Sequence, residues 1–292
     1  MECPRQSTTM GCRLRVSAVS GSAVRLSMLV LYVEEEAGSA RTCPPPGGTG
    51  DDIVVLQEER PQLTGGTVWE ASGLLASALG DFGVEWQGAR VLELGSGTGW
   101  LALKMAQRGA SVTATDRRGM LDLLMRNVLR NQKRFPCTAE ADLARGKVSE
   151  LDVECVELDW EEGTVLPGKW DVIIGCEVMY LSQFYPSLVE TIRRHTNEGT
   201  RIFISWQART EDGKHKQGDF LEQARAAGLK EQLKCVQRTG ANIPVYVYEF
   251  GLHDPNSRLH TGTATLAPPC YPPNSTATNI YNSQVTNVAK GK

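Results

Sequence analysis

The sequence has no long hydrophobic run, no excess of charge of one sign and no clustered cysteines. Among its 292 residues, 31 Lys and Arg balance 34 Asp and Glu, for a net charge of −3 at pH 7. A chain without a basic surplus gives no sign that nucleic acid is its main partner. The longest apolar stretch, Leu26 to Val33, is too short to cross a bilayer, and no apolar segment of the secretory kind follows the first basic residues. We therefore expect no membrane partner.

The cysteines are scattered. The sequence has eight of them, with no C-x-x-C pair and no metal-ligand spacing, so we predict no metal site. Unpaired cysteines suit a reducing compartment. We predict a cytoplasmic location, with the nucleus as a second location. No segment indicates an oligomer interface over ordinary core packing, so we expect a monomer.

The most informative stretch is RVLELGSGTG, residues 90–99. A short apolar strand leads into a turn with three alternate glycines, and a helix-prone apolar run follows. Glycine lets a backbone approach a ligand closely and adopt positive φ. Free N–H groups and the helix dipole lie just beyond such a turn. A plain strand-to-helix turn is the alternative interpretation.

Two acids favour a ligand at this turn. Glu93 lies inside the strand, where a carboxylate is costly without a partner. Asp116 ends the next apolar run, at the position from which an acid accepts hydrogen bonds from a ribose diol. The spacing is Gly-x-Gly-x-Gly and not the Gly-x-Gly-x-x-Gly of a pyrophosphate site, which disfavours nicotinamide-dependent redox chemistry.

Hydrophobic periodicity predicts an α/β fold. Apolar residues at helical spacing also predict a helix over 67–79, ahead of the glycine turn. From residue 90 the two kinds of element alternate, which implies a parallel sheet with helices on both faces. The last two strands have no room for a crossover helix between them, so we expect an antiparallel hairpin. The predicted strands are 90–94, 111–115, 153–158, 170–175, 200–206, 232–237 and 245–250, and the other helices are 99–108, 119–131, 184–196 and 217–227.

The flanking segments differ from this pattern. We predict a poorly ordered N-terminus over 1–20 and a β-hairpin extension over 21–58, in which Ala23–Val33 pairs with Asp52–Gln57. The main domain should span 59–252, with a polar inserted loop at 132–150. The Pro-, Ser-, Thr- and Asn-rich tail, 253–292, is predicted to be disordered.

Polar side chains follow the later strands at the end where open α/β sheets bind ligands. Asp159 could accept a hydrogen bond from an adenine amine and Trp160 could stack on its ring, or they could be a helix cap and a core aromatic. Glu177 and Tyr180 follow the fourth strand. They would share one face if the segment is a helical turn, and together could hold an amine. A surface acid and a packing aromatic are the alternative.

Two further groups have simpler explanations. His195 ends a predicted helix, where a cationic His would favour the dipole, and capping is the preferred interpretation over catalysis. The Lys214–Lys216 group after the fifth strand is predicted to be a solvated loop.

Taken in order, these motifs resemble those of a known family. Thr67-Val-Trp69 before a helix, the ELGSGTG turn, Leu158-Asp-Trp160 and then an acid-x-x-Tyr occur as in the seven-strand protein-lysine methyltransferases of methyltransferase family 16, within the class I enzymes that use S-adenosylmethionine. The similarity runs from about Ile53 to Gly251. The family commonly has Asp-x-x-Tyr where this chain has Glu177-x-x-Tyr180.

The resemblance implies a Rossmann-like seven-strand sheet, mostly parallel, with S-adenosylmethionine as cofactor and a protein as substrate. It implies Glu177 and Tyr180 as the catalytic pair and Ser205–Thr210 as a substrate-side loop. The implied or inferred cofactor contacts are Trp69, Glu93, Gly95, Ser96, Gly97, Asp116, Asp159, Trp160 and Cys176.

The resemblance also implies a reaction. The acceptor lysine must lose its proton before it can attack a sulfonium methyl, and burial lowers the pKa of an amine. Glu177 and Tyr180 would orient the nitrogen without forming a covalent bond, and Trp69 or Tyr180 could contact the positive centre. The alternatives are methyl transfer to a histidine, an N-terminal amine or a small molecule, and a non-catalytic subunit that keeps the fold and binds a partner.

Overall fold

The computed structural model describes residues 16–17, 41–42, 53–58, 64–134, 151–209 and 211–252. Within these ranges the strands are β1 Val16–Ser17, β2 Arg41–Thr42, β3 Leu56–Gln57, β4 Arg90–Leu94, β5 Ser111–Asp116, β6 Val153–Glu157, β7 Val172–Cys176, β8 Arg201–Gln207, β9 Leu229–Arg238 and β10 Pro244–Leu252. The helices are α1 Glu70–Asp81, α2 Trp100–Gln107, α3 Arg118–Arg134, α5 Tyr185–His195 and α6 Glu211–Ala226, with the short 3-10 turns η1 Trp160–Glu162 and η2 Ser182–Phe184.

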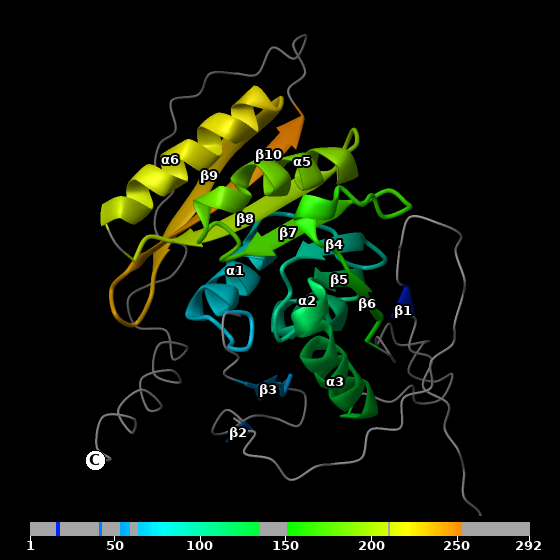
Figure 1. The fold of residues 1–292 in the computed structure, drawn as a ribbon. Coiled ribbons are helices and arrows are strands. Elements are labelled where there is room, and N and C mark those ends of the chain that lie inside the picture. The colour runs from blue at the N-terminus through cyan, green and yellow to red at the C-terminus, as the bar shows by residue number, and fades with distance from the viewer. Residues whose placement is uncertain are drawn as a thin grey trace, which may run out of the picture.

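The main sheet has eight strands in the order β1-β6-β5-β4-β7-β8-β10-β9 (Figure 1). Its centre is parallel, and β10 pairs antiparallel with both β8 and β9. The predicted parallel sheet and terminal hairpin are therefore confirmed. The order reverses at β4, from which the chain goes outward to β5 and β6 and later returns to β7. Ligands bind at such a switch point in open α/β sheets.

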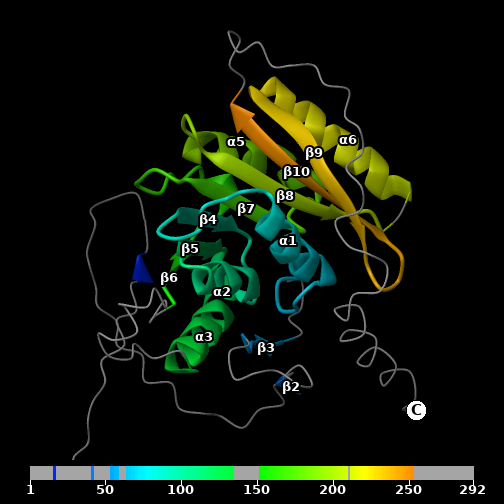
Figure 2. The same cartoon turned by 180° about the vertical axis from the view of Figure 1, so that it is seen from behind.

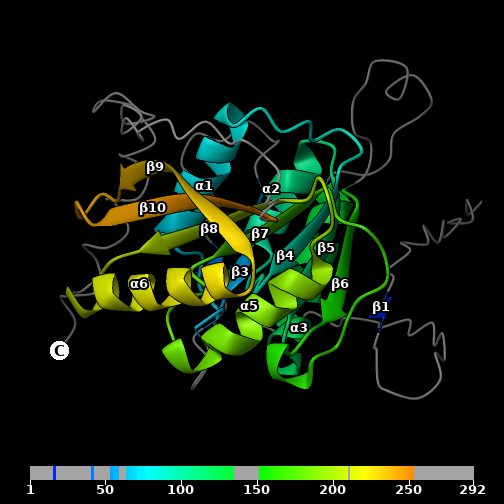
Figure 3. The same cartoon turned by 90° about the horizontal axis from the view of Figure 1, so that it is seen from above.

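Helices cover both faces of the sheet. Figure 3 shows α1 and α2 on one side and α5 and α6 on the other. Alternation along β4 explains the two cores: Val91 packs in the cluster with α1 and α2, and Leu92 and Leu94 pack in the cluster with α5. Glu93 has the same parity as Val91, so its carboxylate is on the α2 side.

The described N-terminal residues add two short pairings. Val16–Ser17 lies parallel to β6, and β3 pairs antiparallel with β2 (Figure 2). The predicted partner of the 52–57 strand, Ala23–Val33, lies outside the described residues. The amide of Asn127 accepts from Leu56 N at 2.6 Å and donates to Leu56 O at 3.0 Å and Thr98 O at 2.9 Å. This side chain therefore ties the N-terminal segment to the glycine turn.

Several predicted boundaries were wrong. Helix α6 begins at Glu211. The Lys214–Lys216 group, which we predicted to be a solvated loop, therefore has helical backbone. Helix α3 continues to Arg134, three residues into the predicted loop, whose remainder from 135 to 150 is outside the described residues. Among the helices that the structure describes, none is long and apolar enough to pass through a membrane.

His195 is a structural side chain. It is 4% exposed, its Nδ1 lies 2.7 Å from Thr191 O, and its Nε2 accepts from Leu166 N at 2.9 Å. Burial lowers its pKa. The ring is therefore a neutral donor and acceptor, and not the cationic cap expected from its place at the end of α5.

Candidate functional site

The glycine turn forms the floor of a pocket at the carboxyl ends of the central strands. Gly95 and Gly97 have φ of 66° and 55°, in the left-handed region. A Cβ on Gly97 would lie 2.6 Å from Gly65 O, in the segment that passes over the turn. Glycine at this position is therefore required by conformation and by space.

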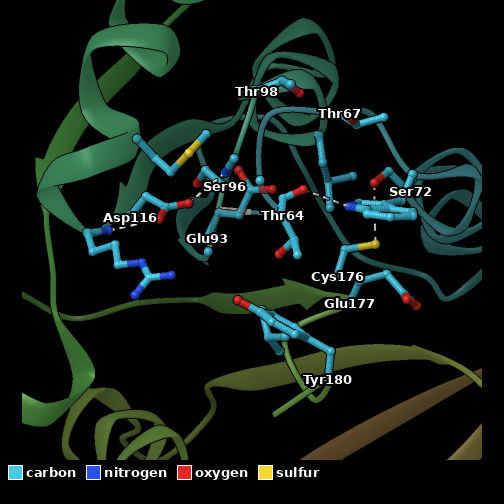
Figure 4. Close-up of a pocket in the computed structure, with 18 of the residues that line it drawn as sticks. Thr64, Thr67, Ser72, Glu93, Ser96, Thr98, Asp116, Cys176, Glu177 and Tyr180 are labelled. Carbon is cyan, nitrogen blue, oxygen red and sulfur yellow. Dashed lines mark hydrogen bonds between the residues drawn. The ribbon is translucent and has the colours of Figure 1, made fainter. Parts of the chain in front are cut away.

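All the predicted site residues line this one pocket. They come from the residue before α1 and from the ends of β4, β5, β6 and β7 or the loops that follow them (Figure 4). They are Trp69, Glu93, Gly95, Ser96, Gly97, Asp116, Asp159, Trp160, Cys176, Glu177 and Tyr180.

Asp116 is held by the backbone around it. Its Oδ2 accepts from Gly97 N and its Oδ1 from Arg117 N, both at 2.8 Å. Burial raises its pKa, and these two N–H groups oppose the rise. Each oxygen keeps a free lone pair, so the carboxylate can still accept from a hydroxyl in the pocket.

Glu93 is a buried acid with one carboxylate oxygen that has no partner in the described part of the chain. It is 2% exposed, and its Oε2 has no hydrogen-bond partner among the described residues. Burial raises its pKa to about 8, and the charge of Asp116 adds to the rise while Ser96 opposes it. Glu93 also lines the pocket, where a buried carboxylate can pair with a cation brought by a ligand.

The structure confirms the cap predicted for Asp159 and places both residues of the pair after β6 at the pocket. Asp159 Oδ1 accepts from Glu161 N at 3.0 Å and so caps η1, and it also lines the pocket. The Trp160 ring is 3.6 Å from where a Cβ on Gly95 would lie. Capping therefore fixes the segment, and the ring forms part of the pocket wall.

Glu177 and Tyr180 do not form the expected helical turn. Glu177 has φ of 57°, in the left-handed region that non-glycine residues rarely adopt. Its N–H donates to Ser205 O at 3.1 Å, which continues the β7–β8 ladder by one residue. Both side chains line the pocket, but they extend in different directions from the end of β7 (Figure 4).

Glu177 already has a cation beside it. Arg209 Nη2 lies 2.7 Å from Glu177 Oε2, and the guanidinium stands 4.6 Å from the centre of the Trp69 ring. Burial raises the pKa of Glu177 to about 7, and Arg209 opposes the rise. The cation that lies on the Trp69 ring is thus the side chain of Arg209.

Cys176 is not a nucleophile. Its Sγ lies 3.4 Å from Ser72 Oγ, and burial raises its pKa to about 12. The thiol stays protonated at neutral pH, so it acts as wall and not as a reacting group.

Sequence reasoning missed part of the pocket. The segment before α1 contributes Thr64 and Gly65, and Ser72, Arg117 and Phe184 also line it. The Gly65-Gly66 pair was an available signal, since such pairs mark tight turns. The predicted substrate-side loop, Ser205–Thr210, was partly wrong, because Ser205–Gln207 belongs to β8. Of the described residues in that range, Ala208 and Arg209 lie beyond the strand.

The residues present fit S-adenosylmethionine. The unpartnered Oε2 of Glu93 suits the ammonium of its amino-acid end, and the free lone pairs of Asp116 suit ribose hydroxyls. The flat ring of Trp160 suits an adenine. The ligand has no phosphate, and the glycine spacing is not that of a phosphate site.

Comparison with known proteins gives the same family. A family model described as lysine methyltransferase matches residues 49–226, more than half of the chain. Protein N-lysine methyltransferase METTL21A of Danio rerio is 33% identical over 49% of this chain, and the match spans 61% of that protein's length. The Mus musculus protein of that name is 30% identical, covering 54% of this chain and 68% of the relative. EEF1A lysine methyltransferase 3 of Xenopus tropicalis is 29% identical, covering 57% and 69%.

These matches confirm the resemblance drawn from the glycine turn and the acid-x-x-Tyr motif. With it they support S-adenosylmethionine as the cofactor and methyl transfer as the class of reaction. The chain belongs to the lysine methyltransferase family.

Proposed function

We propose that this protein transfers a methyl group from S-adenosylmethionine to the side-chain amine of a lysine in another protein. The observation that carries the proposal is the presence of two buried acids in one pocket. Glu93 lies at the end of β4 and Glu177 just beyond β7, on neighbouring parallel strands. One acid can bind the cationic end of the cofactor and the other the cationic acceptor.

The cofactor half of the pocket, which contains Glu93, Asp116, Asp159 and Trp160, binds and orients the cofactor. Glu93 would hold the ammonium group, Asp116 the ribose hydroxyls, and Asp159 with Trp160 the adenine. The cofactor supplies an electrophilic methyl on a positively charged sulfur. These residues keep the ligand in one orientation and form no bond to the methyl group.

The acceptor half of the pocket, which contains Glu177 and Tyr180, must hold a lysine that has lost its proton. A free lysine has a pKa of about 10.4 and is mostly protonated at neutral pH. Glu177 attracts the ammonium into a pocket where burial then favours the neutral amine. The proton leaves to water, and Glu177 with Tyr180 keeps the nitrogen lone pair aligned. The protonated thiol of Cys176 offers no competing nucleophile.

Two measurements test the proposal. Isothermal titration should give saturable binding of S-adenosylmethionine by the purified chain. Methyl-labelled cofactor incubated with lysate should then label a protein, with the label mapping to a lysine. EEF1A, for which one relative is named, is a candidate to include as a purified acceptor.

A Glu93→Gln variant is the matched control, because it removes one charge and keeps the shape of the side chain. Absence of cofactor binding would rule out every methyltransferase function. Label on a histidine or an N-terminal amine would replace lysine as the acceptor, and binding without any transfer would favour the non-catalytic subunit.

A further inference from the structure

Arg209 lies between two residues that were predicted to contact ligands. It is the second residue after β8, and its guanidinium lies against the Trp69 ring at 4.6 Å and against Glu177 Oε2 at 2.7 Å. An aromatic face and a carboxylate are also the two groups that would recognise a substrate ammonium. The chain has therefore placed one of its own cations at the acceptor side of the pocket.

The position of Arg209 is built into the end of the sheet. Its Nη2 donates to Gln207 Oε1 at 2.9 Å and its backbone N–H to Gln207 O at 3.0 Å. The neighbouring Ala208 N donates to Pro244 O at 3.1 Å, on β10. Backbone and side-chain contacts thus hold the guanidinium, so the ion pair is more than a surface encounter.

Glu177 is fixed from the other side. Its left-handed backbone, with φ of 57°, is a conformation that costs free energy and persists where the surroundings impose it. The side chain is 5% exposed, so its charge is largely removed from water. Strain of this kind at a pocket wall indicates that the direction of the carboxylate matters.

The two oxygens of Glu177 have different surroundings. Oε2 lies 2.7 Å from Arg209 Nη2, whereas Oε1 has no ion pair and no hydrogen bond to a described side chain. A backbone hydrogen bond from Gln207 also favours the ionised carboxylate. A buried carboxylate oxygen without a partner is costly unless a donor arrives. The charged and titratable neighbours of this carboxylate are Arg209 and Cys176, and of these two Arg209 favours its ionised form.

We propose that Arg209 is a positioning residue for the methyl acceptor: it holds Glu177 through Oε2, stacked on Trp69, so that Oε1 remains ionised and available to the substrate ammonium. This inference rests on the proposed lysine methyltransferase function. It gives Trp69 an indirect role on the acceptor side, through Arg209. Arginine suits the position because its planar guanidinium can stack and donate from several nitrogens at once, which a lysine cannot do.

Removing the guanidinium should disable Glu177 without touching the cofactor half. A buried acid that loses its counter-charge takes up a proton, and the neutral acid attracts an ammonium poorly. Arg209→Met keeps the length of the side chain and removes the charge. Arg209→Lys keeps the charge and loses the stacked fork.

The test uses two adenosine analogues in which nitrogen replaces the sulfonium sulfur. One carries a 2-(butylamino)ethyl chain and the other an all-carbon chain of equal length. Titration calorimetry should show that the wild-type protein prefers the amine by roughly tenfold or more, the usual size of a hydrogen bond to a charged group. Arg209→Met should reduce the preference to about twofold or less, with S-adenosylhomocysteine binding unchanged. Arg209→Lys should keep most of the preference.

Controls separate this inference from the proposed function. Arg225→Met removes a surface ion pair with Glu231 and should change nothing. Glu177→Gln should abolish the amine preference, and adding Arg209→Met to it should cause no further loss.

Full amine preference in Arg209→Met, or additive losses in the double variant, would overturn this inference and leave the proposed function intact. If Arg209→Met does not bind S-adenosylhomocysteine, the Arg209→Lys variant provides the test instead. Complete loss of the amine preference in Arg209→Lys would also overturn the inference. A wild-type protein that binds neither analogue would overturn the proposed function itself.

Discussion

The two buried acids of the pocket differ in the charged side chain that lies nearest to each. Glu93 and Glu177 are 2% and 6% exposed and belong to neighbouring strands or their ends. Burial raises the pKa of both carboxyl groups, to about 8 for Glu93 and to about 7 for Glu177. The charge of Asp116 adds to the rise at Glu93, whereas Arg209 and a backbone hydrogen bond from Gln207 oppose it at Glu177. In the cofactor half, Glu93 would therefore pair with a cation of the ligand, whereas in the acceptor half Glu177 already pairs with Arg209 of the chain itself. This difference suggests how each half can be disrupted separately.

Glu93→Gln should have the largest effect. Breaking a buried charge pair costs about 3–5 kcal/mol, so the Kd for S-adenosylmethionine should rise at least about a hundredfold. Titration calorimetry measures this directly. Glu157→Gln, which removes the ion pair with the exposed Arg118 at the end of β6, is the control and should bind normally. Equal affinities for wild type and Glu93→Gln would show that Glu93 does not hold the ammonium.

For Glu93→Gln we also predict the sign of the change in the free energy of unfolding. The pKa of Glu93 is raised in the folded state, from 4.5 to about 8, so its contribution to stability is lost as the pH rises through that interval. Without ligand, Glu93→Gln should therefore be more stable than wild type at pH 8.5 and nearly equal to it at pH 4.5. Urea unfolding at the two pH values compares the free energies. A gap that grows toward low pH would contradict the assignment.

Gly97→Ala should come next, because the cofactor half depends on shape as well as charge. Its Cβ would lie 2.6 Å from Gly65 O at a φ of 55°, so the overlying segment must move. We expect a loss of about 2–4 kcal/mol in the free energy of unfolding and at least about tenfold weaker cofactor binding. Gly83→Ala is the matched control, since φ there is 63° and nothing lies within 4 Å. Equal losses at both positions would mean that backbone strain alone accounts for the effect.

The cofactor half was predictable from the sequence because its signals are local. Strand β4 and its glycine turn occupy ten consecutive residues, and the strand bounds at 90–94 agree with the structure. The position of Asp116 followed from one further half-unit of the same pattern. Close approach of backbone, positive φ and helix entry all require glycine at set positions, so the spacing of the glycines after the strand supported the prediction.

The acceptor half was not predictable in its geometry. Its residues were identified by resemblance, but the left-handed backbone of Glu177 has no sequence signal in a residue other than glycine or asparagine. The ion pair with Arg209 joins the ends of two strands and depends on tertiary register. The start of α6 was missed for a related reason, since residues 211–216 have no apolar periodicity and contain Gly213.

The pH dependence of binding distinguishes the two acids further. Glu93 is mostly protonated at neutral pH without ligand, so binding an ammonium should release a proton. Affinity for S-adenosylmethionine should therefore increase nearly tenfold per pH unit below about pH 8 and stop rising there. Above that pH the amine of the ligand, with a pKa of about 7.7–8.0, begins to lose its own proton.

Calorimetry in buffers of different ionisation enthalpy counts the released proton. Glu93→Gln removes the titrating group, so its binding should show little pH dependence below pH 8. Proton release that persists in this variant would assign the titration to Asp116, whose pKa burial also raises.

Tyr180→Phe should have the smallest effect and should appear only in the acceptor half. The hydroxyl is neutral, and a neutral hydrogen bond contributes about 0.5–1.5 kcal/mol, against about 1.5–3 for one to a charged group. We expect kcat/KM on the labelled protein acceptor to fall about two- to tenfold, less than for Glu177→Gln, with cofactor affinity unchanged. Tyr246→Phe makes the same chemical change on β10, at a residue that does not line the pocket, and should be neutral. A loss in Tyr180→Phe as large as in Glu177→Gln would mean that orientation by the phenol, and not the charge held by Arg209, governs the acceptor.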